Sequence, residues 1–239
     1  MDYNRISPLL GSWGPHLKPF IESEKCDAIY KKLREETDRG IKVGPSPGHT
    51  YRVFEETPMK ATKVVFLLQD PYPWEKDGIF TADGIAMSSA TTGKIQPSLE
   101  KFYRGMENDL YDGLNLRGNR VADLSYLSHQ GIMLLNCALT VEVNKASSHY
   151  ELWMPFTTFL FEEVFSTMGN NLIFVLCGDK SHYYEKFINP LQHRYFKIEH
   201  PAAASHMMRD WKHEKIFSKL NKLLLEDNIV IDWIQQNAF

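Results

Sequence analysis

The sequence has few cysteines and no pair of them at metal-binding spacing. Its three cysteines, Cys26, Cys137 and Cys177, lie far apart, and no CxxC motif occurs. This argues against a disulfide framework, a zinc site and an iron–sulfur cluster. Two of the three lie in apolar runs, where a buried, unreactive thiol is the usual finding. We therefore expect a protein of a reducing cytoplasm that holds no metal ion and no other cofactor.

Long hydrophobic runs and an excess of positive charge are also missing. No run of 18 apolar residues occurs, and the N-terminus lacks a signal-peptide pattern, so we expect no membrane partner. Lys and Arg number 27 against 30 Asp and Glu, which gives a net charge of −3. Proteins that coat DNA are usually basic overall, so the composition argues mildly against nucleic acid. A small basic face on an acidic body stays possible, because composition cannot reveal it.

Several common enzyme motifs are absent as well. There is no G-x-S-x-G elbow, no G-x-x-x-x-G-K phosphate loop and no G-x-G-x-x-G dinucleotide turn. Four histidines, His193, His200, His206 and His213, recur roughly every seven residues. The predicted elements distribute them over a strand, a loop and a helix, which argues against one shared metal.

What is present is a regular alternation of apolar strands and helices. With 239 residues and 43% hydrophobic content, the chain can form one sizeable domain, 1–239. Nearly continuous apolar runs predict buried parallel strands at 64–68, 132–135, 172–176 and, more weakly, 195–198. Helical patterns surround them at 24–37, 97–108, 120–129, 152–168, 180–187 and 210–225. The pattern predicts a three-layer α/β/α sandwich around a four-stranded parallel sheet.

Polar residues follow each predicted strand. Asp70 comes after the first, Asn136 after the second, Gly178 and Asp179 after the third, and His200 after the fourth. Each alone is more often a turn or cap residue than a functional one. Parallel strands end at one edge of the sheet, where ligands bind, so together these residues indicate a site.

Five segments in the same order carry a resemblance to a known family. They are KVVFLLQDPYPWEKDGIFTADGIAMS at 63–88, QPSL at 96–99, LLNCALTVE at 134–142, IFVLCGDKS at 173–181 and EHPAAAS at 199–205, and a closing IDW follows at 231–233. In these segments the chain resembles the family 1 uracil-DNA glycosylases, with some features closer to the poxvirus-type members. The similarity extends over about residues 12–233. A small-molecule enzyme would explain the α/β pattern but not these motifs.

The resemblance implies a monofunctional, metal-free DNA glycosylase that hydrolyses the base–sugar bond of a flipped-out nucleotide and leaves an abasic site. Asp70 would activate the attacking water and stabilise the cationic sugar. His200 would donate a hydrogen bond to the anionic base. Asn136 would bind the Watson–Crick edge of the base, Gln69 would hold the base through its backbone, and Tyr72 would form the pocket wall beside C5.

The resemblance also implies contacts with DNA, in the cytoplasm or nucleoid, or in the nucleus for a eukaryotic or viral host. Flipping a nucleotide costs a few kcal/mol, which phosphate contacts and an inserted side chain would offset. The predicted contacts are Pro97, Ser98 and Ser205. Ala204 aligns with the inserted leucine of the family, and His206, Met207 or Met208 is an alternative. Few positive charges are needed, and we expect a monomer.

Several positions depart from the family. Leu68 replaces a glycine, Pro73 replaces a histidine as in poxvirus-type members, and Met87 replaces the base-stacking phenylalanine. A flexible methionine could loosen the pocket, and the stretch 74–81 resembles an insertion at its rim. Uracil is the family default. Two alternatives stay open: a modified cytosine, such as glucosylated hydroxymethylcytosine in phage DNA, which would mean antiviral defence, and a non-catalytic, DNA-binding replication accessory.

Overall fold

The computed structural model describes residues 2–169 and 171–235. The predicted domain, 1–239, also includes residues 1, 170 and 236–239, which lie outside the described ones. Four parallel strands form the central sheet in the order β5-β2-β7-β8. Their bounds are Val64–Leu68 (β2), Ile132–Asn136 (β5), Ile173–Cys177 (β7) and Arg194–Ile198 (β8). The predicted α/β class and the four-stranded parallel sheet are confirmed, and the strand bounds differ by at most one residue at either end.

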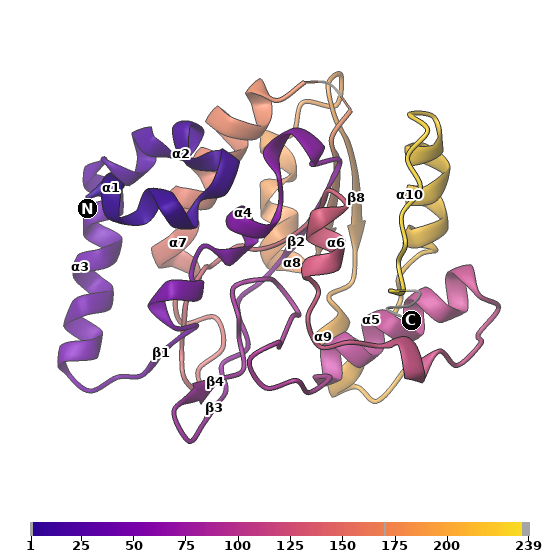
Figure 1. Ribbon diagram of the computed structural model, residues 1–239, viewed down its shortest axis with the longest axis horizontal. Helices are drawn as coiled ribbons and strands as arrows, with labels where there is room; N and C mark the ends of the chain where they lie inside the picture. The colour runs from indigo at the N-terminus through magenta and orange to yellow at the C-terminus, as the bar shows by residue number, and fades with distance from the viewer. Residues whose placement is uncertain (1, 170, 236–239) are drawn as a thin grey trace.

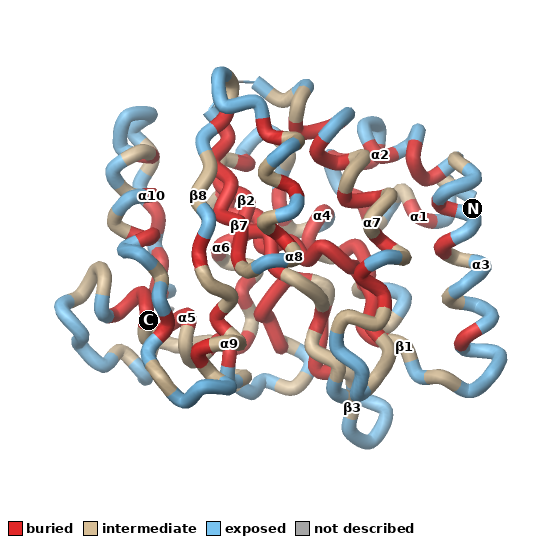
Figure 2. Tube along the Cα trace, turned by 180° about the vertical axis from the view of Figure 1, so that it is seen from behind, coloured by how far each residue is buried: buried red, intermediate tan, exposed pale blue. Residues whose placement is uncertain are grey.

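Three of the four strands are buried throughout. Every residue of β2, β5 and β7 is buried, which explains why their apolar runs are continuous rather than alternating. Strand β8 lies at the sheet edge, and only Ile198 of its five residues is buried. The weaker apolar pattern of β8 therefore reflects the exposure of this strand, whereas β5, at the other edge of the sheet, is buried. In Figure 2 the buried segments run through the middle of the molecule, along the strands.

Helices cover both faces of the sheet. Helices α4 and α6 contact β5, and α8 contacts β2 and β7. Figure 1 shows α1–α3 and α7 at one side of the strands and α5 and α10 at the other. The bounds are Tyr3–Ile6 (α1), Gly14–Ile21 (α2), Glu24–Asp38 (α3), Arg52–Glu56 (α4), Pro97–Leu110 (α5), Ser125–His129 (α6), Tyr150–Phe159 (α7), Asp179–His182 (α8), Pro201–His206 (α9) and Ile216–Leu225 (α10).

Four predicted helices are shorter or less regular than their patterns indicate. The helix predicted at 180–187 consists of α8 and a following 3-10 helix, Tyr183–Phe187. The helix predicted at 120–129 begins only at Ser125, because the Ala122 carbonyl accepts a hydrogen bond from Ser89 and holds this stretch as a loop. The helix predicted at 210–225 begins at Ile216, because Glu214 and Lys215 have positive φ angles. The helix predicted at 152–168 continues past α7 as a π-helical and a 3-10 turn.

Two short ladders lie outside the main sheet. Strands β1 (Val43–Gly44) and β6 (Val141–Glu142) pair with each other, and β3 (Glu75–Lys76) and β4 (Ile79–Phe80) form a hairpin. In Figure 1 the hairpin and α9 lie at the lower edge, towards which the arrow of β8 points. The hairpin therefore projects at the edge where the parallel strands end. Among the described helices, none has the length and apolar character to cross a bilayer.

Candidate active site at the carboxyl edge of the sheet

Asp70 lies just beyond the end of β2, held in a small hydrogen-bond network. The Gln69 side-chain amide donates to Asp70 Oδ1 at 2.6 Å and to Ser147 Oγ at 2.7 Å. The Ser147 backbone N–H donates to Asp70 Oδ2 at 2.7 Å. Both carboxylate oxygens therefore have a donor, and the side chain is fixed in one orientation.

The surroundings of this carboxylate are partly dry and carry a nearby cation. Burial raises the pKa of Asp70 above its ordinary value, although the hydrogen bonds from Ser147 and Gln69 and the charge of Lys180 oppose that shift. The Lys180 ammonium lies 4.2 Å from the centroid of the Tyr150 ring, and the Tyr150 hydroxyl donates to the Lys180 carbonyl at 2.9 Å. Lys180 is therefore held in place on the α8 side of the site.

Asn136 ends the strand next to that of Asp70. It pairs in register with Leu68, the last residue of β2, and it is buried. Beyond the strands the pairing continues, because Cys137 N donates to the Leu68 carbonyl at 2.9 Å and Ala138 N to the Gln69 carbonyl at 3.1 Å. The segments that follow β2 and β5 therefore stay hydrogen-bonded to each other, and Asn136 and Asp70 lie at the same edge of the sheet.

His200 follows β8 and caps the short helix α9. Its Nδ1 accepts the backbone N–H of Ala202 at 3.1 Å, so the ring proton is on Nε2. Burial lowers the pKa of the imidazole to about 4, with a further contribution from the charge of His206. At neutral pH, His200 is therefore an uncharged ring whose Nε2–H can donate to a ligand.

Gly178 connects the ends of β7 and β8. Its backbone N–H donates to the Ile198 carbonyl at 2.9 Å, and its φ is +86°. A β-carbon at this position would lie 2.9 Å from the Cβ of His200, a distance that real β-carbons do not reach. Glycine is thus required at this position for two reasons: its backbone conformation and the close approach of the His200 side chain.

Tyr72 has a fixed hydroxyl. It donates to the Met87 carbonyl at 3.1 Å and shares a 2.7 Å hydrogen bond with Ser98 Oγ. Burial raises the pKa of the phenol well above its ordinary value, so it stays protonated. Ser98 is itself buried, which places it behind Tyr72 rather than on an open surface.

Met87 has a left-handed backbone, with φ +64°. The buried Asp83 fixes this turn by accepting hydrogen bonds from Ser88 Oγ at 2.6 Å and from Ala90 N at 2.7 Å. Arg52 pairs with Asp83 at 3.0 Å. The carbonyl of Met87 that receives the Tyr72 hydroxyl is thus oriented by a buried ion pair.

The predicted DNA-contacting residues fall into two groups. Ser98 and Ala204 are buried, and a methyl side chain with no exposed surface cannot be inserted into DNA. The position that aligns with the family's inserted leucine therefore offers no side chain for insertion, and a DNA contact of Ala204 stays a prediction. Pro97 and His206 are exposed and Ser205 is half-buried, and Met207 and Met208 are exposed at 65% and 90%.

The sequence-based prediction missed three residues of this site: Ser147, Lys180 and Asp83. Ser147 is 77 residues from Asp70 and has a positive φ of +65°. A serine in a loop gives no pattern that would indicate such a contact. Lys180 lies within the segment 173–181, which carries part of the family resemblance and follows a predicted strand. Its position beside the sheet edge could therefore have been predicted from the sequence.

The chain is similar in sequence to known proteins over nearly its whole length. The chain is 30% identical over 224 residues to a uracil-DNA glycosylase of Campylobacter jejuni subsp. doylei, covering 92% of both chains. It is 31% identical over 227 residues to the uracil-DNA glycosylase of a Pseudomonas aeruginosa strain, covering 94% of both. No family model matches the chain.

Solved structures share the fold. The mimivirus uracil-DNA glycosylase superposes with a TM-score of 0.78 at 21% identity, covering 96% of this chain and 88% of that one. A structure titled as the UNG of Nitratifractor salsuginis gives a TM-score of 0.60 at 18% identity, covering 92% and 94%. With full-length relatives at 30% identity and this fold, the chain belongs to the uracil-DNA glycosylase family.

Proposed function

We propose that this protein removes uracil from DNA by hydrolysing the N-glycosidic bond of a flipped-out nucleotide, leaving an abasic site. The observation that carries the proposal is the position of three side chains at one edge of one sheet: Asp70 just after β2, Asn136 at the end of β5 and His200 just after β8. A carboxylate, an amide and a neutral imidazole match the charges that this reaction develops. We propose that the protein acts as a monomer.

Asp70 would serve the sugar side of the reaction. As the bond between C1′ and the base breaks, the sugar gains oxocarbenium character, which a carboxylate stabilises. The same carboxylate orients a water molecule whose oxygen attacks C1′ and whose proton it accepts. The donors on Asp70, Gln69 and the Ser147 N–H, support this role because they fix the carboxylate before substrate arrives.

His200 and Asn136 would serve the base side. The departing base takes the bonding electron pair, and its negative charge is shared with O2. The Nε2–H of a neutral His200 can donate to that oxygen without giving up its proton. Asn136 would pair with the Watson–Crick edge through its carboxamide, which both donates and accepts. The backbone of Gln69 would complete the base site.

The pocket wall favours uracil over a modified cytosine. Two hydrogen bonds hold the Tyr72 hydroxyl, so its ring has little freedom to move aside for a large substituent at C5. Met87, buried next to this wall, would contact the base in place of an aromatic ring. The poxvirus-type features stay a prediction.

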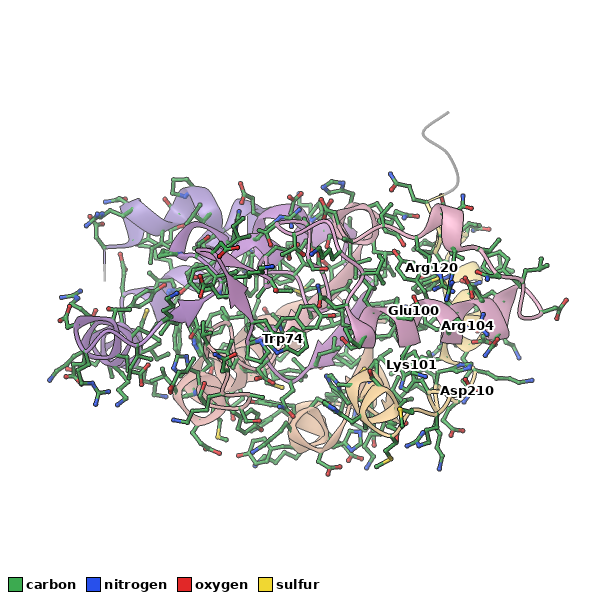
Figure 3. The ribbon with its side chains drawn as sticks, turned by 90° about the horizontal axis from the view of Figure 1, so that it is seen from below. Trp74, Glu100, Lys101, Arg104, Arg120 and Asp210 are labelled. Atoms are coloured by element: carbon green, nitrogen blue, oxygen red, sulfur yellow. The ribbon has the colours of Figure 1, made fainter. Side chains whose placement is uncertain are left out.

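DNA would lie across the edge of the sheet where the parallel strands end. The side chains of Met207 and Met208, at the end of α9, are long, apolar and exposed, which suits insertion into the stack that the flipped base leaves. Pro97, Ser205 and His206 would contact the backbone near them. Lys101 on α5 is on the face viewed in Figure 3 and offers a positive charge for a phosphate.

A panel of DNA substrates tests the proposed function. The purified protein is incubated with uracil-containing DNA, unmodified DNA and DNA with glucosylated hydroxymethylcytosine, and mass spectrometry identifies any released base. We expect free uracil and abasic sites from the first substrate only. Release from the phage-type DNA alone would establish the modified-base alternative, and binding without any release would establish the accessory alternative.

Gly178 offers a separate prediction about the imidazole. Gly178→Ala is expected to slow uracil release by about 10–100-fold, since its methyl group would displace His200. It should also destabilise the fold by about 1–3 kcal/mol, because φ +86° with ψ 169° is a backbone conformation that essentially only glycine adopts. Single-turnover kinetics and thermal melts measure the two effects. Gly118→Ala is the control, because nothing lies within 4 Å of its β-carbon. Unchanged release by Gly178→Ala would contradict the position of His200.

A further inference from the structure

The β3–β4 hairpin presents a tryptophan at the edge where the site lies. Trp74 directly precedes β3 and is 43% exposed. Viewed from below, Trp74 lies towards the middle of this face (Figure 3). It is two residues from Tyr72 and four from Asp70 in the chain. Trp74 therefore offers an exposed aromatic face close to the proposed site.

The indole of Trp74 is held in a defined orientation. It stacks on the Tyr72 ring with centroids 5.4 Å apart and planes inclined by 16°. The Trp74 carbonyl accepts the Thr81 N–H at 2.9 Å, and the Pro73 carbonyl accepts the Asn144 N–H at 2.6 Å. The two stacked rings therefore form a fixed aromatic surface that extends from Tyr72 in the pocket wall to the solvent-exposed Trp74.

The hairpin beyond Trp74 is also anchored. Glu75 pairs with Lys42 at 2.7 Å and accepts the backbone N–H of Gly78. Thr91 Oγ1 donates to the Phe80 carbonyl at 2.6 Å. These contacts tie both strands of the hairpin, so the exposed part of the indole is pre-organised for binding.

We propose that Trp74 is a stacking site for an unpaired base of the strand that carries the flipped nucleotide. Every base has a π-face that can stack on an aromatic side chain. In a duplex, neighbouring bases cover both faces, so only an unpaired base is free to stack on Trp74. The inference rests on the proposed function, because that function brings the strand to Asp70 and Tyr72.

Binding to uracil-free DNA tests this stacking site without requiring catalysis. Fluorescence anisotropy with labelled single strands and duplexes of one sequence compares wild type, Trp74→Ala and Trp74→Phe. We expect Trp74→Ala to weaken single-strand binding by about 10-fold and to leave duplex binding unchanged. Trp74→Phe, which keeps an aromatic face, should restore most of the affinity. Ile79→Ala is the matched control, because it removes an exposed apolar side chain of the same hairpin.

Tryptophan fluorescence reports on the same contact. The sequence has five tryptophans, and the other four, Trp13, Trp153, Trp211 and Trp233, are buried. Stacking of a base should therefore quench the emission of Trp74 selectively. We expect a single strand to quench wild-type emission and the duplex to quench it much less. No quenching by a saturating single strand would overturn the proposal.

Uracil release separates a failure of this proposal from a failure of the proposed function. On single-stranded DNA, Trp74→Ala should raise KM by about 10-fold at nearly constant kcat, with little change on the duplex. If Trp74 acted only by holding Tyr72 in place, Trp74→Ala would slow uracil release from single-stranded and duplex DNA by the same factor. That result would overturn the stacking role. If wild type binds and shows quenching but releases no uracil, the proposed function fails while the stacking site stands.

Discussion

Replacing Asp70 with asparagine is expected to slow uracil release by about 10³-fold. The substitution keeps the size of the side chain but removes the charge that stabilises the sugar and the base that accepts the proton of water. One of the two donors, Gln69 Nε2 or Ser147 N, would also face the new amide N–H₂. Single-turnover release from uracil-containing DNA measures the effect, and thermal melts check that the variant is folded.

The pH profile gives this prediction a second test. Because burial raises the pKa of Asp70, wild-type release should fall with decreasing pH at a pKa above the ordinary value of 3.8. Only the carboxylate is active, so protonation removes activity, and Asp70→Asn should lose this acid limb. The control is Asp179→Asn, an exposed carboxylate at the same sheet edge. If Asp70→Asn released uracil at the wild-type rate, the role assigned to Asp70 would be disproved.

Replacing His200 with alanine is expected to slow release by about 10²–10³-fold, the usual cost of losing one pre-organised donor to a developing anion. His200→Gln keeps an N–H donor and should lose less. Both variants also lose or alter the hydrogen bond from Ala202, so thermal melts must accompany the kinetics. His129→Ala serves as the control, because His129 is exposed, pairs with Glu56 and comes before the start of β5 rather than after the end of a strand.

The ionisation state of His200 can be read from the same kinetics. With a pKa of about 4, the imidazole stays neutral from mildly acidic to alkaline pH. Wild-type release should therefore not decline as the pH rises through the ordinary pKa of histidine, about 6.5. A decline that disappears in His200→Gln would mean that the imidazolium is the active form, contrary to the tautomer inferred from the Ala202 contact.

The central sheet and the ends of its strands could be predicted from the apolar runs of the sequence alone. Continuous apolar runs can be buried on both faces only in a covered parallel sheet, so β2, β5 and β7 were predictable to within one residue. The parallel direction then places Asp70, Asn136 and His200 at one edge. The helices were less predictable, since hydrogen bonds from distant loops, such as Ser89 to Ala122, replaced the first turns of one pattern.

The tertiary structure alone decided which groups surround these side chains. Ser147 reaches Asp70 from 77 positions away, and Asp83 orients the Met87 carbonyl through a turn with a left-handed residue. Ala204, which aligns with an inserted leucine, is in the core, and the exposed methionines lie beyond it. Hydrophobic periodicity encodes burial along one element, whereas such contacts depend on loop conformations that no local pattern specifies.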